Sequence, residues 1–409
     1  MRVIKDSKVD TQRTTNTSIL PVRSNVSTAP VTPTGSVQFD IQTNMFYGTT
    51  PHSLVPLGSR NIGVITTGVT PTGIAITPDG KKAYVANNNN YGIAGQDSVT
   101  VIDVATNLPK LIQHPSFIQP YTVTISKDGT KAYVTNSGSP LNLLGAQGTI
   151  TVIDTLTDSV IGVINGFDGP SGMAIAPGTN KAYVNNYGGP GGVQSGNGTT
   201  VRVVNLLTNT ITGPPIVVGL APAAITSTPG GKFVYTANYV DGNTNTGTLS
   251  KIRTSDDTVV ATIGPFSPNG FSGPFAIAIT PDGTKALVTN FGSNNFAPFG
   301  NSVSVVDLLG STIIKNIIVG IQPSGLAITP DGSKALVSNY NTLYAVGAPS
   351  FTDLTPGEGT VNIVNLGTLE LVGPTIVVGQ APANIAVTPD GSKAYVSCFV
   401  GNSVSVVSI

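Results

Sequence analysis

The 409-residue chain carries 20 basic and 20 acidic residues, so its formal net charge is zero, and only 10% of its residues are charged. A typical soluble domain has about 25% charged residues. Nucleic-acid binding as a main function is disfavoured, because neutralising phosphates requires a basic surface. We expect no membrane insertion either, because the apolar stretches are short and interrupted by Gly and Pro, whereas a transmembrane helix needs about 18 unbroken apolar residues.

The residues that hold most metals and cofactors are scarce. The single cysteine, Cys398, excludes an intramolecular disulfide framework and is expected to be a buried small side chain. The two histidines, His52 and His114, lie far apart in the sequence, which argues against a His-based zinc or haem site. We therefore expect no cofactor and no metal. The first ten residues, MRVIKDSKVD, contain no apolar core of a secretory signal, and the localisation stays open.

Residues 1–34 are rich in Thr, Ser, Asn and Pro and show no sustained periodicity. Such a composition predicts an extended or disordered N-terminal arm. The alternative is an arm that docks on a neighbouring subunit or on another protein.

Residues 35–60 predict a small β-hairpin segment that leads into the rest of the chain. Within them, GSVQFDIQTNMFYGTTPHSLVPLG reads as a strand, a Gln-Thr-Asn turn, a second strand and a short apolar end. This pattern resembles a short segment found in viral tail-fibre and virion-surface proteins. The resemblance implies a virion or cell-surface setting in preference to the cytoplasm.

Residues 61–409 contain seven copies of one motif at a period near 50 residues. The first copy is PTGIAITPDGKKAYVAN, and its equivalents begin at Pro120, Pro170, Pro222, Pro274, Pro323 and Pro382. Internal repeats of this length indicate a solenoid, a propeller or an array.

Each copy predicts four strands. In the first copy these are Gly73–Thr77, then Ala83–Ala86 after the Asp79-Gly80 hairpin turn, then Val99–Val104 after a variable loop. A fourth strand follows a short turn, as in Val160–Ile164 of the second copy. The β-branched and aromatic residues of these runs suit a pleated sheet. A four-stranded unit of this period is typical of a propeller blade, so the fold class is all-β, a seven-bladed β-propeller of antiparallel blades.

The two ends of the repeat array predict how the ring closes. The seventh copy reaches Ile409 after only three strands, and a spare strand, Asn61–Thr67, precedes the first copy. We expect this N-terminal strand to complete the last blade, because pairing the ends removes two open sheet edges.

The motifs AYVAN, AYVTN, AYVNN, ALVTN and ALVSN follow the Asp-Gly turns. They resemble the YVTN-type seven-bladed β-propeller repeat family over residues 61–409. The resemblance implies the propeller fold. The resemblance does not specify a function, because that family and its lactonase-like relatives include surface-layer proteins, binding modules and some enzymes.

The recurring polar residues favour structural roles, so we predict no catalytic residue among them. The Asp of the hairpin turn becomes Gly178 and Gly230 in two copies, which indicates turn geometry. The Asn that ends each second strand is expected to satisfy backbone groups where the strand breaks. The Lys that precedes the second strand in six copies is expected to guard a solvated edge. The turn aspartates are Asp79, Asp128, Asp282, Asp331 and Asp390.

The loops after the second strands are the candidate site. Equivalent blade positions place them at one face of the ring, around the channel mouth, and they are polar with aromatic residues among them. Such a surface suits sugars or a protein partner, although the same loops could simply pack on one another. The candidate binding residues are Tyr91, Tyr187, Tyr239, Phe291, Phe296, Phe299, Tyr340, Tyr344, Phe351 and Phe399.

Three functions fit these features. The first is a non-catalytic structural or interaction protein, a surface or virion-type component that assembles through its N-terminal arm. The second is a lactonase-like enzyme at the channel mouth, for which His, Arg or Glu would have to converge. The third is a scaffold for glycans or peptides. Because no catalytic set recurs and the charge is low, the sequence favours the first.

Overall fold

The computed structural model describes residues 60–89, 95–138, 148–188, 198–239, 247–264, 270–292, 299–343 and 355–409, with four short strands before residue 60. All the regular elements in these segments are strands, and no helix there is long and apolar enough to cross a membrane. The chain divides into two compact units, Met1–Gly63 and Val64–Ile409.

The first unit contains a small sheet in the order β1-β2-β3-β4. Strand β1 runs parallel to β2, and β2, β3 and β4 are antiparallel, with Phe39 opposite Phe46. The rest of the predicted arm, 1–34, lies outside the described residues, and the boundaries predicted at 34 and 60 stay predictions. The strands are β1 (Val22–Arg23), β2 (Val37–Asp40), β3 (Met45–Thr49) and β4 (Leu54–Pro56).

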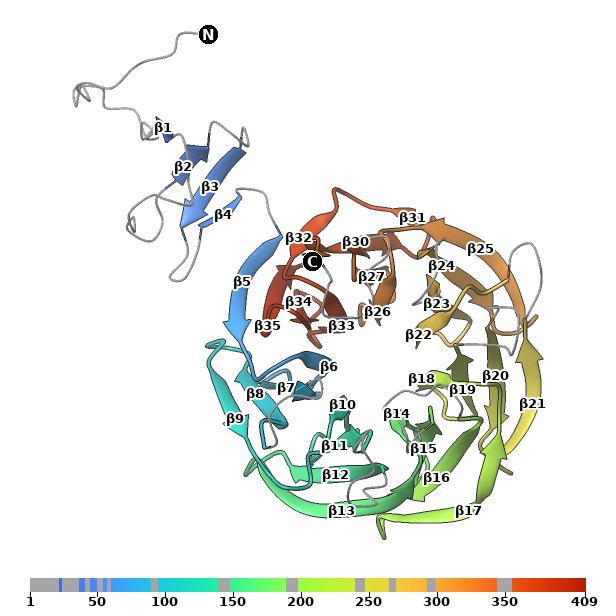
Figure 1. Ribbon diagram of the computed structural model, residues 1–409. Helices are drawn as coiled ribbons and strands as arrows, with labels where there is room; N and C mark the ends of the chain where they lie inside the picture. The colour runs from blue at the N-terminus through green and yellow to red at the C-terminus, as the bar shows by residue number, and fades with distance from the viewer. Residues whose placement is uncertain are drawn as a thin grey trace. The chain divides into compact units, whose positions relative to one another are not determined.

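The second unit is a ring of seven sheets, one for each sequence repeat, as Figure 1 shows. Blade 1 consists of β6 (Pro71–Ile76), β7 (Lys82–Asn87), β8 (Ser98–Asp103) and β9 (Pro109–Ile112). Blade 2 consists of β10 (Pro120–Ile125), β11 (Lys131–Asn136), β12 (Gly148–Asp154) and β13 (Ser159–Phe167). Blade 3 consists of β14 (Pro170–Ile175), β15 (Lys181–Asn186), β16 (Thr200–Asn205) and β17 (Thr210–Val217).

The remaining blades follow the same plan with one local change. Blade 4 consists of β18 (Pro222–Ser227), β19 (Phe233–Asn238), β20 (Thr248–Arg253) and β21 (Thr258–Ile263). Blade 5 consists of β22 (Pro274–Ile279), β23 (Lys285–Gly292), β24 (Phe299–Asp307) and β25 (Thr312–Ile318). Blade 6 consists of β26 (Pro323–Ile328), β27 (Lys334–Asn339), β30 (Gly359–Asn365) and an outer strand split into β31 (Glu370–Leu371) and β32 (Ile376–Val378). Its long loop holds the two-stranded ladder of β28 (Thr342–Leu343) and β29 (Thr355–Pro356).

The last blade closes the ring as the sequence predicts. It contains β33 (Pro382–Val387), β34 (Lys393–Cys398), β35 (Ser403–Ser408) and, as its outer strand, β5 (Asn61–Thr66). Two bonds to Asn402 continue the closure, one from the Thr67 N–H to the backbone oxygen at 3.0 Å and one from the Thr70 N–H to Oδ1 at 2.8 Å. The all-β, seven-bladed antiparallel propeller is therefore confirmed.

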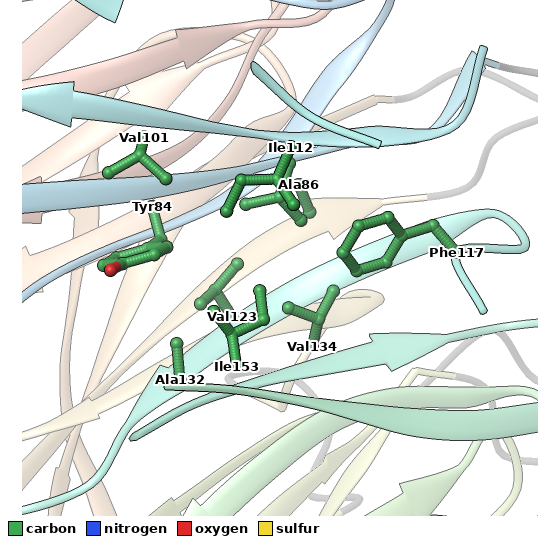
Figure 2. Close-up of a cluster of buried hydrophobic side chains, with 10 residues drawn as sticks. Tyr84, Ala86, Val101, Ile112, Phe117, Val123, Ala132, Val134 and Ile153 are labelled. Atoms are coloured by element: carbon green, nitrogen blue, oxygen red, sulfur yellow. The ribbon is translucent and has the colours of Figure 1, made fainter. Parts of the chain in front are cut away.

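Among the described residues, seven of the eight hydrophobic clusters lie between neighbouring blades, one for each pair. Figure 2 shows the cluster between blades 1 and 2, where Tyr84 and Ala86 face Val123, Val134 and Ile153. The neighbouring residues of the same strand, Ala83 and Val85, belong to the cluster on the opposite face of blade 1. Because each second strand is covered on both faces, its residues form an unbroken apolar run.

Polar contacts between blades supplement this packing. Asp158, in the outer turn of blade 2, accepts bonds from Lys82 Nζ at 2.8 Å and from the hydroxyl of the fully buried Tyr84 at 2.6 Å. Lys181 and Tyr183 contact Asp257 in the same way between blades 3 and 4. The prediction that these lysines guard a solvated sheet edge is wrong, because β7 and β15 are inner strands with partners on both sides.

The alternation of strand direction gives the ring two different ends. We call the end with the Asp-Gly turns the turn end and the opposite end, with the loops after each second strand, the loop end. At the turn end Asp79 accepts the Thr77 hydroxyl at 2.6 Å and the Lys81 N–H at 3.1 Å, and Gly80 has a φ of +71°. Asp103 and Asp154 likewise accept bonds within their own turns. These contacts confirm the prediction that these repeat aspartates have structural roles in their turns.

Candidate functional site

The loop end brings together aromatic side chains from five consecutive blades. Five of them directly follow the repeat Asn or, in the seventh blade, Cys398, and one, Phe275, is the second residue of β22. The buried Tyr239 and Phe291 form the centre of one cluster, against which Tyr187, Phe275 and Tyr340 pack while remaining half-buried. We call this set the aromatic belt, and its members are Tyr187, Tyr239, Phe275, Phe291, Tyr340 and Phe399.

The rings of the belt form a continuous series. The ring centroids are 6.1 Å apart for Tyr239 and Phe275 and 5.1 Å apart for Phe275 and Phe291. They are 6.2 Å apart for Phe291 and Tyr340 and 6.4 Å apart for Tyr340 and Phe399. The interplanar angles, between 34° and 79°, correspond to tilted and edge-to-face contacts, which aromatic pairs prefer to a flat sandwich. The belt is therefore a packed surface in which each ring supports the next.

A repeated backbone contact fixes the position of every belt residue except Phe275. In every blade the N–H of the residue after the second strand donates to the carbonyl of the residue before the first-strand proline, over 2.9–3.1 Å. Tyr340, for example, donates to Gln322 at 3.0 Å. The accepting residues all have φ between +48° and +56°. They are Thr70, Gln119, Gly169, Ala221, Gly273, Gln322 and Ala381.

That conformation is unusual, because a residue before proline is ordinarily extended and a non-glycine residue rarely adopts positive φ. Five of the seven residues are not glycine. Each such residue costs about 1–2 kcal/mol of strain, which the surrounding structure compensates. The backbone bond holds the start of each loop against the first strand and so sets the height of the belt.

The Asn residues that end the second strands lie directly beneath the belt. Asn290 Nδ2 donates to Ser302 Oγ at 3.0 Å and to Ser304 Oγ at 2.9 Å, and five other blades repeat this cross-strand contact. The expectation that these side chains satisfy backbone groups is borne out for Asn186 and Asn290, whose Oδ1 atoms accept a backbone N–H, and for Asn136, whose Nδ2 donates to the Val134 carbonyl at 3.3 Å. In the seventh blade the position is taken by Cys398, which is buried as predicted, and burial raises the pKa of its thiol.

Blades 1 and 2 interrupt the belt with polar residues. Asn88 and Ser137 occupy the positions that are aromatic in the other blades. Between these blades, Gln119 is 5% exposed and its Oε1 atom has no hydrogen-bond partner, and the Oδ1 atom of Asp97 is also buried without one. Burial raises the pKa of Asp97 to about 6, although a bond from the Gln119 N–H opposes that effect. The loop end thus has an aromatic arc over blades 3–7 and a polar arc over blades 1 and 2.

Tyrosine hydroxyls add neutral hydrogen-bonding groups to the aromatic arc. Burial raises the pKa of Tyr187 to about 12. Burial also raises the pKa of Tyr121, the second residue of β10, and the nearby phenols of Tyr187 and Tyr340 raise it further. The three hydroxyls, from blades 2, 3 and 6, are therefore close enough to interact electrostatically, and those of Tyr121 and Tyr187 stay protonated at neutral pH.

Charged side chains are distributed unequally between the two ends of the ring. At the turn end Asp and Lys recur in nearly every blade. Of the loop-end residues that the structure describes, only Asp97, Asp168 and Glu358 are charged, and none is Lys or Arg. The loop end therefore has no positive groups, in its described part, that would attract an anion.

The structure brings five of the ten predicted site residues together: Tyr187, Tyr239, Phe291, Tyr340 and Phe399. Phe299 opens β24 opposite Gly292. The sequence did not reveal Phe275 and Tyr121 as belt neighbours, because they occupy a first-strand position that holds small residues such as Ala223 and Ser324 in other blades. The predicted residues Tyr91, Phe296, Tyr344 and Phe351 lie outside the described residues.

Groups capable of other chemistry are few among the described residues. No cluster of three His, Cys, Asp or Glu side chains there could hold a metal ion. One hydroxyl contacts a possible base, since Ser116 Oγ lies 2.8 Å from His114 Nδ1. The same nitrogen accepts the Ser116 N–H at 3.2 Å, and Thr151 donates to Ser116 Oγ at 2.9 Å, so these contacts also stabilise a local turn.

Comparison with known proteins supports the fold alone. No protein-family model matches the chain, and no curated protein matches it significantly. A solved structure titled Kuenenia stuttgartiensis hydrazine synthase, one of many matching chains, has a TM-score of 0.66 at 17% sequence identity. The match covers 88% of this chain and 99% of that chain. At this identity the two proteins share the propeller architecture, and the activity named in that title does not transfer.

Proposed function

We propose that this protein is a non-catalytic structural or interaction propeller that presents its loop end to a partner. The observation that carries the proposal is the aromatic belt, a series of half-buried and buried rings at the end of the ring where the described residues include no basic group. Half-exposed aromatic residues surrounded by neutral groups are typical of binding surfaces. Anchoring of five of the six belt residues by equivalent backbone bonds limits the entropy lost on binding.

The setting of this interaction is also a proposal. Residues 35–60 resemble a short segment of viral tail-fibre and virion-surface proteins. This resemblance favours a virion or cell-surface component that assembles through its N-terminal arm, by self-association or with protein partners. Met1–Gly63 and Val64–Ile409 are two compact units, which supports separate roles for the arm in assembly and for the propeller in binding. Membership of the YVTN-type repeat family belongs to the same proposal and is supported by the AYVxN motifs at the ends of the second strands.

Removing residues 1–58 tests assembly through the arm. This cut precedes β5, so the last blade keeps its outer strand. Light scattering coupled to gel filtration and electron micrographs should show higher-order assembly for the full chain and monomers for the truncated one, with unchanged circular dichroism. As a control, removal of residues 1–66 deletes β5 and should lower the unfolding temperature. Equal assembly with and without residues 1–58 would rule out the arm.

A lactonase-like enzyme is the competing function, and the Ser116–His114 contact is the observation that favours it. If that contact supplied a nucleophile and its base, the full chain would hydrolyse simple lactones and Ser116→Ala would abolish turnover. We expect no turnover above the buffer rate. Hydrolysis that disappears in Ser116→Ala would replace the non-catalytic proposal.

A further inference from the structure

We propose that the loop end binds a neutral carbohydrate, with the apolar face of a sugar ring on the aromatic arc and its hydroxyls on the polar arc. This inference rests on the proposed function, since it names the ligand class of the same surface. It depends on the contrast between blades 3–7 and blades 1–2.

The two arcs match the two kinds of surface on a sugar. A pyranose ring has a face of C–H groups, which packs on aromatic rings, and an edge of hydroxyls, which needs hydrogen-bond partners. The aromatic arc offers the half-buried rings of Tyr187, Phe275 and Tyr340. The polar arc has at the equivalent positions the half-buried Ser137 and the buried Asn88, whose Nδ2 donates to the Pro120 carbonyl. Binding sites of this kind combine an apolar lining with a few placed polar groups.

The unpartnered oxygen atoms of the polar arc require a donor. Gln119 Oε1 and Asp97 Oδ1 have no hydrogen-bond partner, although nearly all buried polar atoms in proteins are paired. The two residues are directly connected, because the Gln119 N–H bonds to the Asp97 carboxyl. A sugar hydroxyl is the kind of donor that both oxygens lack, and because both atoms are buried, the residues that cover them must shift for it to reach them. A purely apolar ligand would leave both unpaired, which costs free energy.

The charge pattern selects a neutral ligand. Phosphate, sulfate or an acidic sugar would meet Asp97, Asp168 and Glu358 with no described Lys or Arg to compensate. These three carboxylates lie on different parts of the ring and form no metal-holding cluster with other described residues. The hydroxyls of Tyr121 and Tyr187 stay protonated, so they can both donate to and accept from a sugar hydroxyl.

The test is a titration of the full-length protein with four neutral hexasaccharides, of glucose, galactose, mannose and N-acetylglucosamine. Calorimetry measures affinity, and tyrosine emission reports on the belt because the chain contains no tryptophan. We expect saturable binding of at least one sugar, weakened about tenfold in Tyr340→Ala by loss of a ring contact. Gln119→Ala should weaken it about fivefold, by loss of a hydrogen bond. Leu309→Ala is the control, because Leu309 is 95% exposed at the turn end.

The outcomes separate this inference from the proposed function. The carbohydrate assignment is overturned if none of the four sugars binds saturably. It is also overturned if a sugar binds equally well to the folded Tyr340→Ala and Gln119→Ala variants. Tetramethylammonium and a proline-rich peptide are titrated in parallel. If either binds and Tyr340→Ala removes that binding while no sugar binds, the loop end remains a binding surface and only the carbohydrate assignment is wrong. If no probe binds and removal of residues 1–58 leaves assembly unchanged, both proposals fail. Urea midpoints verify that each variant folds.

Discussion

The buried carboxyl of Asp97 predicts a pH-dependent change in stability that the variant Asp97→Asn should remove. Burial raises the pKa of Asp97 from 3.8 to about 6, so the folded protein binds the proton more tightly than the unfolded chain does. Such a group makes the protein more stable as the pH falls from 7 towards 4, and this contribution is lost as the pH rises through 6. An asparagine carries no charge at any of these pH values.

The magnitude follows from the size of the shift. Two pKa units correspond to about 3 kcal/mol at ~1.36 kcal/mol per unit. Water reaches part of the side chain and screens it, so we expect about half of that value. Asp97→Asn should therefore raise the free energy of unfolding by about 1–1.5 kcal/mol at pH 7.5 and leave it nearly unchanged at pH 4.

Urea unfolding followed by tyrosine emission at pH 4, 6 and 7.5 provides the measurement. The difference between parent and variant isolates Asp97, because the other titrating groups are common to both proteins. Asp103→Asn is the matched control: turn bonds, chiefly from the Thr106 N–H, lower the pKa of Asp103, so its replacement should destabilise the protein at pH 7.5. The reasoning would be refuted if Asp97→Asn changed the free energy of unfolding equally at pH 4 and pH 7.5, or if it lowered that free energy at pH 7.5.

Three further changes test the packing of the ring. Asp158→Ala leaves Lys82 Nζ and the buried Tyr84 hydroxyl with only the Thr155 carbonyl as acceptor and should cost about 1–3 kcal/mol in urea unfolding. A double-mutant cycle with Tyr84→Phe should show coupling, and simple additivity would contradict the contact. Gly273→Ala places a Cβ 2.5 Å from the Gly292 oxygen at a φ of +56°, whereas the Cβ of Gly213→Ala meets open space at a φ of +68°. Gly273→Ala should therefore lower the free energy of unfolding by about 1–2 kcal/mol more than Gly213→Ala does. Equal losses in urea unfolding would disprove the close approach. Cys398→Asn introduces the amide found in the other six blades, with Ser403 and Ser405 as its partners. It should change the free energy of unfolding in urea by less than about 1 kcal/mol. Unfolding of this variant at 37 °C would show that the seventh blade needs the thiol.

The repeat pattern was sufficient to predict the fold because every blade uses the same local devices. The Asp-Gly turns, the apolar second strands and the spare strand before the first copy each have a direct structural counterpart, from Gly80 at φ +71° to β5 beside β35. The errors concern contacts between elements. Lys82 looked like an edge residue because nothing in its own repeat shows that Asp158 of the next blade lies 2.8 Å away.

The candidate site was predictable in part. A constant offset from the repeat Asn placed Tyr187, Tyr239, Phe291, Tyr340 and Phe399 at the same height in consecutive blades, and the structure packs them into one cluster or ring series. The offset is a local property, so the sequence reveals it directly. Phe275 occupies a different offset, and its place between Tyr239 and Phe291 depends on how the first strand of one blade meets the second strands around it.

The sequence by itself therefore determined the number of blades, the strands within each, the closure of the ring and the end at which the aromatic residues gather. Tertiary structure decided the rest: the positive φ before each proline, the inter-blade bonds of Asp158, the break in the belt at blades 1 and 2, and the unpaired oxygens of Gln119 and Asp97. The reason is physical. Turns and strand periodicity depend on residues near one another in the chain, whereas burial, pairing and pKa depend on side chains that only the closed ring brings together.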